Sequence, residues 1–159
     1  NFGSNENQQT DPVFSIAVVP LYVMGEENDA RTILKLEAEA AKTTGTGIKN
    51  AFFKSSDYIE FTENTKNSIT FTVNPGVANN YLMRFRFMNM NTESMKVRLT
   101  IEDANGIVLR NDDIEFPVAN EKWRILNTTS GGYINAGTYK ITLESGNMKG
   151  LRLESFEFQ

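Results

Sequence analysis

The sequence predicts an all-β chain that folds as an antiparallel β-sandwich. Short runs of alternating apolar and polar residues recur along most of its length, and this period-two pattern is typical of strands with one buried face. Turn signals rich in Asn, Gly and Pro separate the runs. No helical pattern of about ten residues lies between the predicted strands, so a parallel α/β sheet is not expected.

The first 32 residues differ in composition from the rest. Residues 1–11 are polar, which indicates a linker or a disordered arm. Residues 13–24 are β-branched and aromatic and predict a strand, whose second half Pro20 confines to an edge or a bulge. We therefore expect residues 1–32 to be a linker plus an edge strand, or the remnant of an upstream domain. Residues 33–159 are expected to form the sandwich.

The first predicted strand of the sandwich covers residues 34–41 and carries two glutamates. In a strand, Glu37 and Glu39 share a face with their Cβ atoms roughly 7 Å apart. Carboxylates that close repel each other unless water or a cation separates them, so the pair indicates a hard-cation site. Two other interpretations stay open. The segment can be an exposed acidic edge strand, or a helical turn, because Ala and Glu are good helix formers.

Further strand signals follow a Gly/Thr loop at residues 42–50. They lie at residues 58–61, 69–73, 81–87, 97–101, 123–125, 139–143 and 151–158. Asn105-Gly106 predicts a tight type I′ hairpin turn. In the last segment the alternation of apolar residues slips at Glu154-Ser155, which predicts a β-bulge that changes the direction of Glu154.

Composition narrows the classes of function. A chain of 159 residues with net charge −4 fits one domain with a full core. Its cations are not clustered, so nucleic acid is not an expected partner, and no apolar run approaches the roughly 20 residues of a membrane span. The start of the sequence lacks a signal-peptide pattern. With no Cys and no His, Ser-His-Asp and Cys-His hydrolysis are excluded.

Several stretches, in this order and spacing, resemble carbohydrate-binding modules of families six and thirty-five, which are galactose-binding-domain-like. The resemblance covers about residues 33–158 and leaves out the N-terminal 32. It is carried by residues 36–40, 57–61, 81–87, 136–143 and 150–158.

The resemblance implies a jelly-roll sandwich, a structural calcium ion and non-catalytic sugar binding. The calcium ligands of the family fall on Glu37, Glu39 and Glu154, with carbonyl groups of the loop at residues 43–50 completing the shell. Glu154 stands where the family usually has Asp, so its reach to the ion differs. Oxygen ligands are the kind that calcium prefers.

The sugar-contacting positions of the family fall on Phe52, Trp123 and Asn147. Aromatic rings stack on the C–H faces of pyranoses, and amides bind hydroxyl pairs. Phe52 replaces a more usual Tyr or Trp. Trp123 is followed by an alternating apolar residue, Ile125, so a place in the core is its alternative role.

We therefore expect a non-catalytic carbohydrate-binding module, appended to a secreted or surface glycoside-active enzyme. Its partners would be a polysaccharide or oligosaccharide and a catalytic domain in the same parent chain, in an extracellular, periplasmic or cell-surface location. One alternative is a structural or protein-interaction sandwich that has lost sugar binding. Another is a carboxylate glycosidase, for which the candidate residues are Asp57, Glu60, Asp112 and Asp113.

Overall fold

A computed structural model of the chain describes residues 34–159. The strand expected at residues 13–24, and the linker or domain remnant expected for residues 1–32, lie outside the described residues. Within them, no helix is long and apolar enough to cross a membrane.

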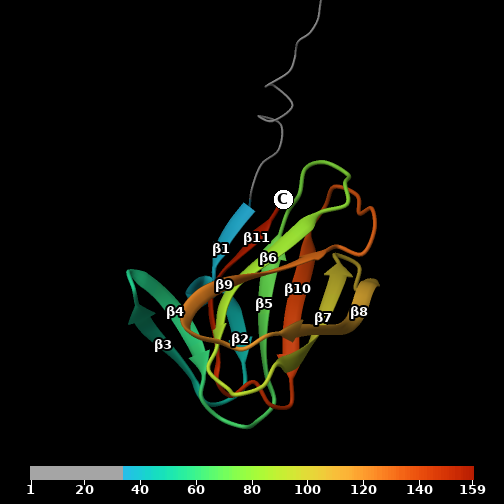
Figure 1. Cartoon of the computed structure of the whole chain (residues 1–159). Helices are drawn as coiled ribbons and strands as arrows, with labels where there is room; N and C mark the ends of the chain where they lie inside the picture. The colour runs from blue at the N-terminus through green and yellow to red at the C-terminus, as the bar shows by residue number, and fades with distance from the viewer. Residues whose placement is uncertain (1–33) are drawn as a thin grey trace, which may run out of the picture. The chain divides into compact units, whose positions relative to one another are not determined.

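The described residues form two antiparallel sheets that pack face to face, so the predicted β-sandwich is confirmed (Figure 1). One sheet has the order β3-β4-β11-β6-β9, with β1 paired to β11, and we call it the six-stranded sheet. Its strands are β1 (Leu34–Glu37), β3 (Ile48–Phe53), β4 (Ser56–Phe61), β6 (Leu82–Asn89), β9 (Ala119–Thr129) and β11 (Leu151–Phe158). The five-stranded sheet has the order β2-β5-β10-β7-β8. Its strands are β2 (Lys42–Thr44), β5 (Asn67–Val73), β7 (Met95–Asp103), β8 (Val108–Phe116) and β10 (Tyr139–Ser145).

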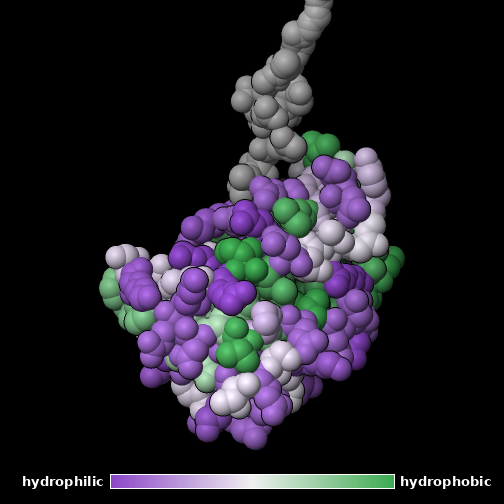
Figure 2. All heavy atoms as spheres, in the orientation of Figure 1, coloured by the Kyte–Doolittle hydropathy of each residue, from purple (hydrophilic) through white to green (hydrophobic). Residues whose placement is uncertain are grey.

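The core between the sheets is rich in phenylalanine. The ring of Phe156 lies 4.9 Å from that of Phe71 and 4.8 Å from that of Phe85, so aromatic rings from both sheets interlock. Such ring pairs contribute about 0.5–1.5 kcal/mol beyond the area that they bury. Polar side chains between the apolar ones point away from this core, which leaves an outer face on each sheet. Figure 2 shows hydrophilic residues over most of the visible face, with separate apolar patches toward its middle.

The β-bulge predicted in the last strand is confirmed. The pairing of β11 with β6 shifts register between Leu153 and Ser155. One extra residue at this point restores the direction of the side chains that follow it. As a result Leu153 and Phe156, on either side of the bulge, are both fully buried in the core.

The strand predicted over residues 34–41 is too long. β1 ends at Glu37, and Ala38–Ala40 form a short 3-10 helix, η1. The alternative of a helical turn is correct here, because these residues favour a helix and the turn places Ala38 in the core, where it is fully buried. Glu37 and Glu39 therefore do not lie on one face of a strand.

One hairpin turn also differs from expectation. At Asn105-Gly106 only the glycine has a positive φ, +83°, and the Gly106 amide donates to the Asp103 carbonyl at 3.1 Å. This is a type I turn followed by a left-handed glycine, and not the predicted type I′ turn. The type I′ pattern occurs instead between β3 and β4, where Lys54 and Ser55 have φ of 51° and 65°.

Candidate ligand site

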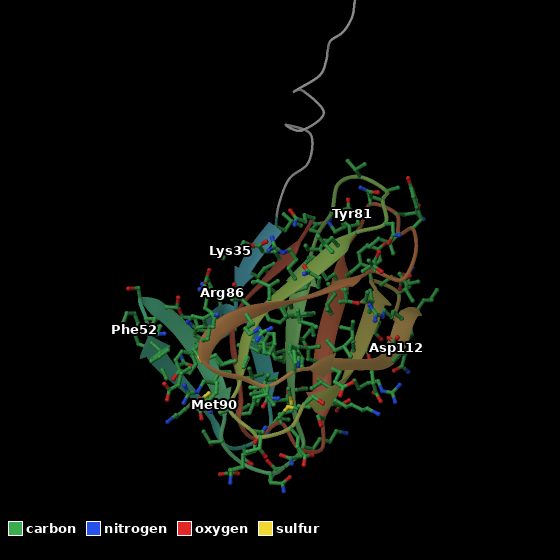
Figure 3. The ribbon with its side chains drawn as sticks, viewed as in Figure 1. Lys35, Phe52, Tyr81, Arg86, Met90 and Asp112 are labelled. Carbon is green, nitrogen blue, oxygen red and sulfur yellow. The ribbon has the colours of Figure 1, made fainter. Side chains whose placement is uncertain are left out.

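A cavity of about 660 Å³ lies at one end of the sandwich, between the loop that joins β6 to β7 and the loop that joins β10 to β11. Figure 3 shows Met90, at the start of the first loop, at the lower end of the molecule in this view. Its lining is polar apart from two methionines and contains no aromatic ring. The lining residues are Met90, Asn91, Thr92, Glu93, Ser94, Met95, Lys96, Ser145 and Asn147.

A buried asparagine holds one wall of this cavity. Asn89 is fully buried, and its Nδ2 donates to the carbonyl oxygens of Glu93 at 3.0 Å and Phe116 at 3.1 Å. Its Oδ1 accepts from the backbone and side-chain amides of Asn91, at 3.0 and 2.9 Å. All the hydrogen-bonding capacity of the Asn89 side chain is thus used to fix the β6–β7 loop.

The same network joins the two walls. Asn91 Nδ2 also donates to the Lys149 carbonyl at 2.9 Å, and the Met90 amide donates to the Gly150 carbonyl at 2.9 Å. Gly150 allows this close approach, because a Cβ at that position would lie 2.8 Å from the Asn91 amide group. Its φ of +93° is also one that residues with a side chain rarely adopt. The two loops are therefore mechanically coupled.

Asn147, one of the predicted sugar-contacting residues, lies on the second wall. Its side chain is exposed, and its Oδ1 accepts from the Lys149 amide at 3.0 Å. No hydrogen bond of its Nδ2 occurs within residues 34–159, so the protein leaves this donor unused there. Ser145 Oγ fixes the same turn through a hydrogen bond from the Asn147 amide at 3.1 Å.

Trp123 lies elsewhere, on the outer face of the six-stranded sheet. Ala119 of β9 pairs with Asn89 of β6, whereas Arg124 pairs with Phe87. Four residues of β9, 120–123, therefore stand opposite the single residue Met88 and form a large bulge, which we call the β9 flap. The flap folds over the sheet, toward the β3–β4 hairpin (Figure 1).

Two contacts hold the β9 flap in place. Lys54 Nζ, at the tip of the β3–β4 hairpin, donates to the Glu121 carbonyl at 3.1 Å. The Trp123 ring packs edge-on against the Tyr58 ring, with centroids 5.5 Å apart. Under the flap, Tyr58 and Met88 are buried although both belong to the outer face. Trp123 therefore completes a small second core, outside the sandwich.

Two arginines alternate with these rings. The Arg86 guanidinium lies 5.6 Å from the Trp123 ring centre, and the Arg152 guanidinium lies 5.3 Å from that of Tyr58. Each arginine also pairs with a shielded glutamate: Arg86 with Glu154 at 3.6 Å and Arg152 with Glu60 at 3.2 Å. Cation–π contacts and ion pairs of this kind reinforce each other where water is partly excluded.

Phe52 stands apart from both places. It lies near the tip of the β3–β4 hairpin, with 67% of its surface exposed (Figure 3). In β3 it pairs with Asp57 across the hairpin, whereas its neighbour Phe53 is half-buried and points to the other face. Phe52 thus lies on the β3–β4 hairpin, Trp123 in the β9 flap and Asn147 on the β10–β11 loop, and no ring contact or hydrogen bond joins the three within residues 34–159.

The predicted metal ligands are neighbours in the fold without sharing one centre. Glu37 of β1 pairs with Ser155 of β11, next to Glu154. The Glu154 side chain is directed to Arg86 and also accepts from Ser155 Oγ at 2.5 Å. Glu39 contacts Asp57, a carboxylate that is not one of the predicted calcium ligands.

The contact between Glu39 and Asp57 is electrostatically unfavourable. The carboxylate of Asp57 raises the pKa of Glu39, with smaller contributions from partial desolvation, a hydrogen bond to Asp57 and the charge of Glu37. The donors in this region are oxygen atoms, which suits a hard cation. Among the described residues, however, no three acidic side chains are gathered around a common point.

Three of the four candidate carboxylates for a glycosidase, Glu60, Asp112 and Asp113, are held in ion pairs. Asp112 pairs with Arg110 at 2.7 Å, and Asp113 pairs with Arg98 at 3.1 Å. As consecutive residues of β8 they project to opposite faces of the sheet, and neither lines the cavity. Sequence reasoning missed the Asn89–Asn91 network, because an asparagine inside a strand pattern carries no signal of which loops it will join.

Comparisons with known proteins now identify the fold. No protein-family model matches the sequence, and no curated protein matches it. Among solved structures, a family 35 carbohydrate-binding module from Clostridium thermocellum matches with a TM-score of 0.65 and 20% identity, over 80% of this chain and 98% of the module. A Cellvibrio mixtus lichenase 5A module in complex with cellotriose matches with a TM-score of 0.58 and 17% identity, over 79% of this chain and 95% of the module.

The chain has the fold of family 35 and family 6 carbohydrate-binding modules. The resemblance inferred from sequence is thereby confirmed at the level of the fold. The same fold also occurs inside larger enzymes. An Arthrobacter globiformis T6 isomalto-dextranase, solved in complex with panose, matches with a TM-score of 0.67 and 18% identity over 79% of this chain, which spans only 23% of that enzyme.

Proposed function

We propose that residues 34–159 form a non-catalytic carbohydrate-binding module whose glycan site is the cavity between the β6–β7 and β10–β11 loops. The observation that carries the proposal is the position of Asn147. It lines a cavity of about 660 Å³ at the loop end of a module fold, and its Nδ2 makes no hydrogen bond within residues 34–159. Amides and hydroxyls on preformed loops are the groups that bind sugar hydroxyls.

The role of this module in a larger protein is inferred from enzymes that contain the same fold next to a catalytic domain. Since related modules are parts of larger glycoside-active enzymes, we propose that this module anchors a catalytic domain of the same parent chain to a polysaccharide outside the cell or at its surface. The ligand roles of Phe52 and Trp123 stay predictions. Alanine variants at each position test them independently of the cavity.

Replacing the side-chain amide of Asn147 by a carboxylate of the same shape tests whether the cavity binds glycans. Asn147→Asp keeps the Oδ1 that accepts from Lys149 and replaces the free Nδ2 donor with a carboxylate oxygen. Asn105→Asp makes the same change at another exposed turn, outside the cavity lining. Affinity electrophoresis of the full chain in dextran, laminarin, lichenan and β-mannan measures binding. We expect Asn147→Asp to lose retardation in a glycan that retards both the wild type and Asn105→Asp.

A structural sandwich without a ligand is the second candidate. It is favoured by the absence of an aromatic ring from the cavity lining and by the position of Trp123 in the β9 flap, packed against Tyr58. A chain that folds normally and binds none of the glycans would establish this alternative in place of the first.

We also propose a structural calcium ion, held by Glu37, Glu39 and Glu154 as the family resemblance implies. Support comes from the crowding of carboxylates around Glu39, which raises the pKa of that side chain and which a cation would relieve. Calcium binding that involves Glu154 requires this side chain to leave Arg86. A cation that binds only the folded state stabilises it, so the melting temperature of the full chain should rise with added calcium and fall in chelator.

A further inference from the structure

The end of the sandwich opposite the cavity carries a second arrangement suited to a sugar. Two loops meet there: residues 74–81, which join β5 to β6, and residues 130–138, which join β9 to β10. They lie side by side at the upper end of the molecule in Figure 1, and Figure 3 shows Tyr81 at this end, far from Met90. We call this pair of loops the upper loops.

The upper loops are locked together through their backbones. Asn79 and Ile134 exchange two hydrogen bonds, of 3.0 and 2.9 Å, and the Gly137 amide donates to the Pro75 carbonyl at 3.0 Å. Tyr139, buried at the start of β10, donates its hydroxyl hydrogen to the Asn135 carbonyl at 2.7 Å. The paths of both loops are thus fixed without any ligand.

A buried serine adds a third anchor. Ser130 is 2% exposed, and its Oγ accepts from the Tyr81 amide at 3.0 Å. The same hydroxyl group lies 2.7 Å from the Gly132 carbonyl and 3.1 Å from the Asn80 side-chain oxygen, to which it can donate. Gly131 and Gly132 have φ of 83° and 152°, which lets the chain turn sharply just before Tyr133.

This rigid frame presents an aromatic ring to solvent. Tyr133 is 77% exposed, the largest exposed fraction among the large hydrophobic side chains of the described residues. Its hydroxyl group has no hydrogen-bond partner within residues 34–159. Val77, on the other loop, is 62% exposed, and polar amide side chains at Asn80 and Asn135 are also exposed. A ring held out on fixed loops, with amides around it, loses little entropy when a pyranose stacks on it.

We propose that Tyr133 and the upper loops form a second carbohydrate-binding site, which takes a pyranose ring of the same polysaccharide by stacking. The proposal extends the proposed function from one site to two. Two sites at opposite ends of one module engage a long glycan at separate points, so binding to a polymer exceeds binding to a short oligosaccharide through effective concentration.

The test is a titration of the ¹⁵N-labelled full chain with cellotriose, laminaritriose and mannotriose, followed by amide NMR. We expect one of these to shift the amides of Gly131, Gly132 and Asn135. Tyr133→Ala should remove these shifts, because the stacking ring is gone. Val118→Ala, which removes an exposed apolar side chain between β8 and β9, outside the upper loops and the cavity lining, serves as the control and should leave them unchanged.

The titration distinguishes failure of the cavity site from failure of the second site at the upper loops. Shifts at Asn91 and Asn147 with none at Gly131, Gly132 and Asn135 overturn the second site and support the first. Shifts confined to the upper loops support the second site and overturn the cavity. Should no amide shift at either end with any of the three sugars, both sites are rejected. Shifts at the upper loops that persist in Tyr133→Ala also overturn the second site, because stacking on that ring would not cause them.

Discussion

Replacing Gly150 by alanine should uncouple the two walls of the proposed glycan cavity. The new Cβ would lie 2.8 Å from both the nitrogen and the oxygen of the Asn91 amide, and 3.0 Å from its Cγ. Asn91 must therefore move, and it then loses its hydrogen bonds to Asn89 and to the Lys149 carbonyl. The β6–β7 loop would no longer be tied to the β10–β11 loop through this side chain.

The size of the effect has two parts. A residue with a side chain at φ of +93° costs about 1–2 kcal/mol in backbone strain. Loss of two hydrogen bonds, each with a net worth of about 1 kcal/mol, adds roughly 2 kcal/mol. The sum of about 3–4 kcal/mol should lower the melting temperature of a domain of this size by roughly 10–15 °C.

Gly106→Ala provides the control for backbone strain. Gly106 has a similar φ, +83°, and the nearest atom to its added Cβ is 3.8 Å away. Chemical unfolding of the full chain should give Gly106→Ala only the first, smaller cost. In an Asn91→Ala background, the excess cost of Gly150→Ala over Gly106→Ala should fall to within about 0.5 kcal/mol. Equal costs of the two glycine variants in the wild-type background would refute the coupling of the walls through Asn91.

Three further predictions concern the acidic region and the β9 flap. Because Asp57 raises the pKa of Glu39 above 4.5, the folded chain binds that proton more tightly than the unfolded chain, and stability is lost as the pH rises through the raised value. In chelator, melting curves of Glu39→Gln should lack this loss and give a more stable protein at pH 7; curves that run parallel to the wild type at every pH would contradict it. Glu37→Gln should lower the melting temperature in calcium and make it insensitive to chelator, whereas an unchanged response to chelator would separate Glu37 from the ion. Trp123→Ala should cost about 2–3 kcal/mol in unfolding free energy, because it uncovers Tyr58 and Met88 and removes the stack on Arg86; unaltered stability would show that the flap does not cover a second core.

The period-two alternation of apolar and polar residues was sufficient to predict the sandwich, because a strand with one buried face requires that alternation. The bulge in β11 could also be located, because the slip at Glu154-Ser155 interrupts that alternation. The end of β1 could not. Leu34–Ala38 alternate as a strand does, and only the burial of Ala38 against the other strands decides that the chain turns after Glu37.

The site was harder to predict, because contacts between distant segments decide it. The β9 flap arises because β9 has more residues than β6 between two paired positions. No sequence feature near Trp123 indicates which strand β9 will pair with. A type I′ turn at Lys54-Ser55 is equally hard to foresee, since neither residue is a usual choice at positive φ. Asn147 was placed by resemblance alone, and the cavity beside it emerged only with the Asn89–Asn91 network.

Binding of glycans by the full chain and by its Asn147→Asp variant is the most direct test of the central claim. Isothermal titration with the polysaccharide that retards the wild type most strongly should give saturable binding for the wild type and for Asn105→Asp. The account predicts at least a tenfold loss of affinity at the cavity for Asn147→Asp, as expected when a hydrogen-bond donor to a sugar hydroxyl is replaced by a carboxylate. Equal affinities of Asn147→Asp and Asn105→Asp would contradict the claim that the cavity is the glycan site.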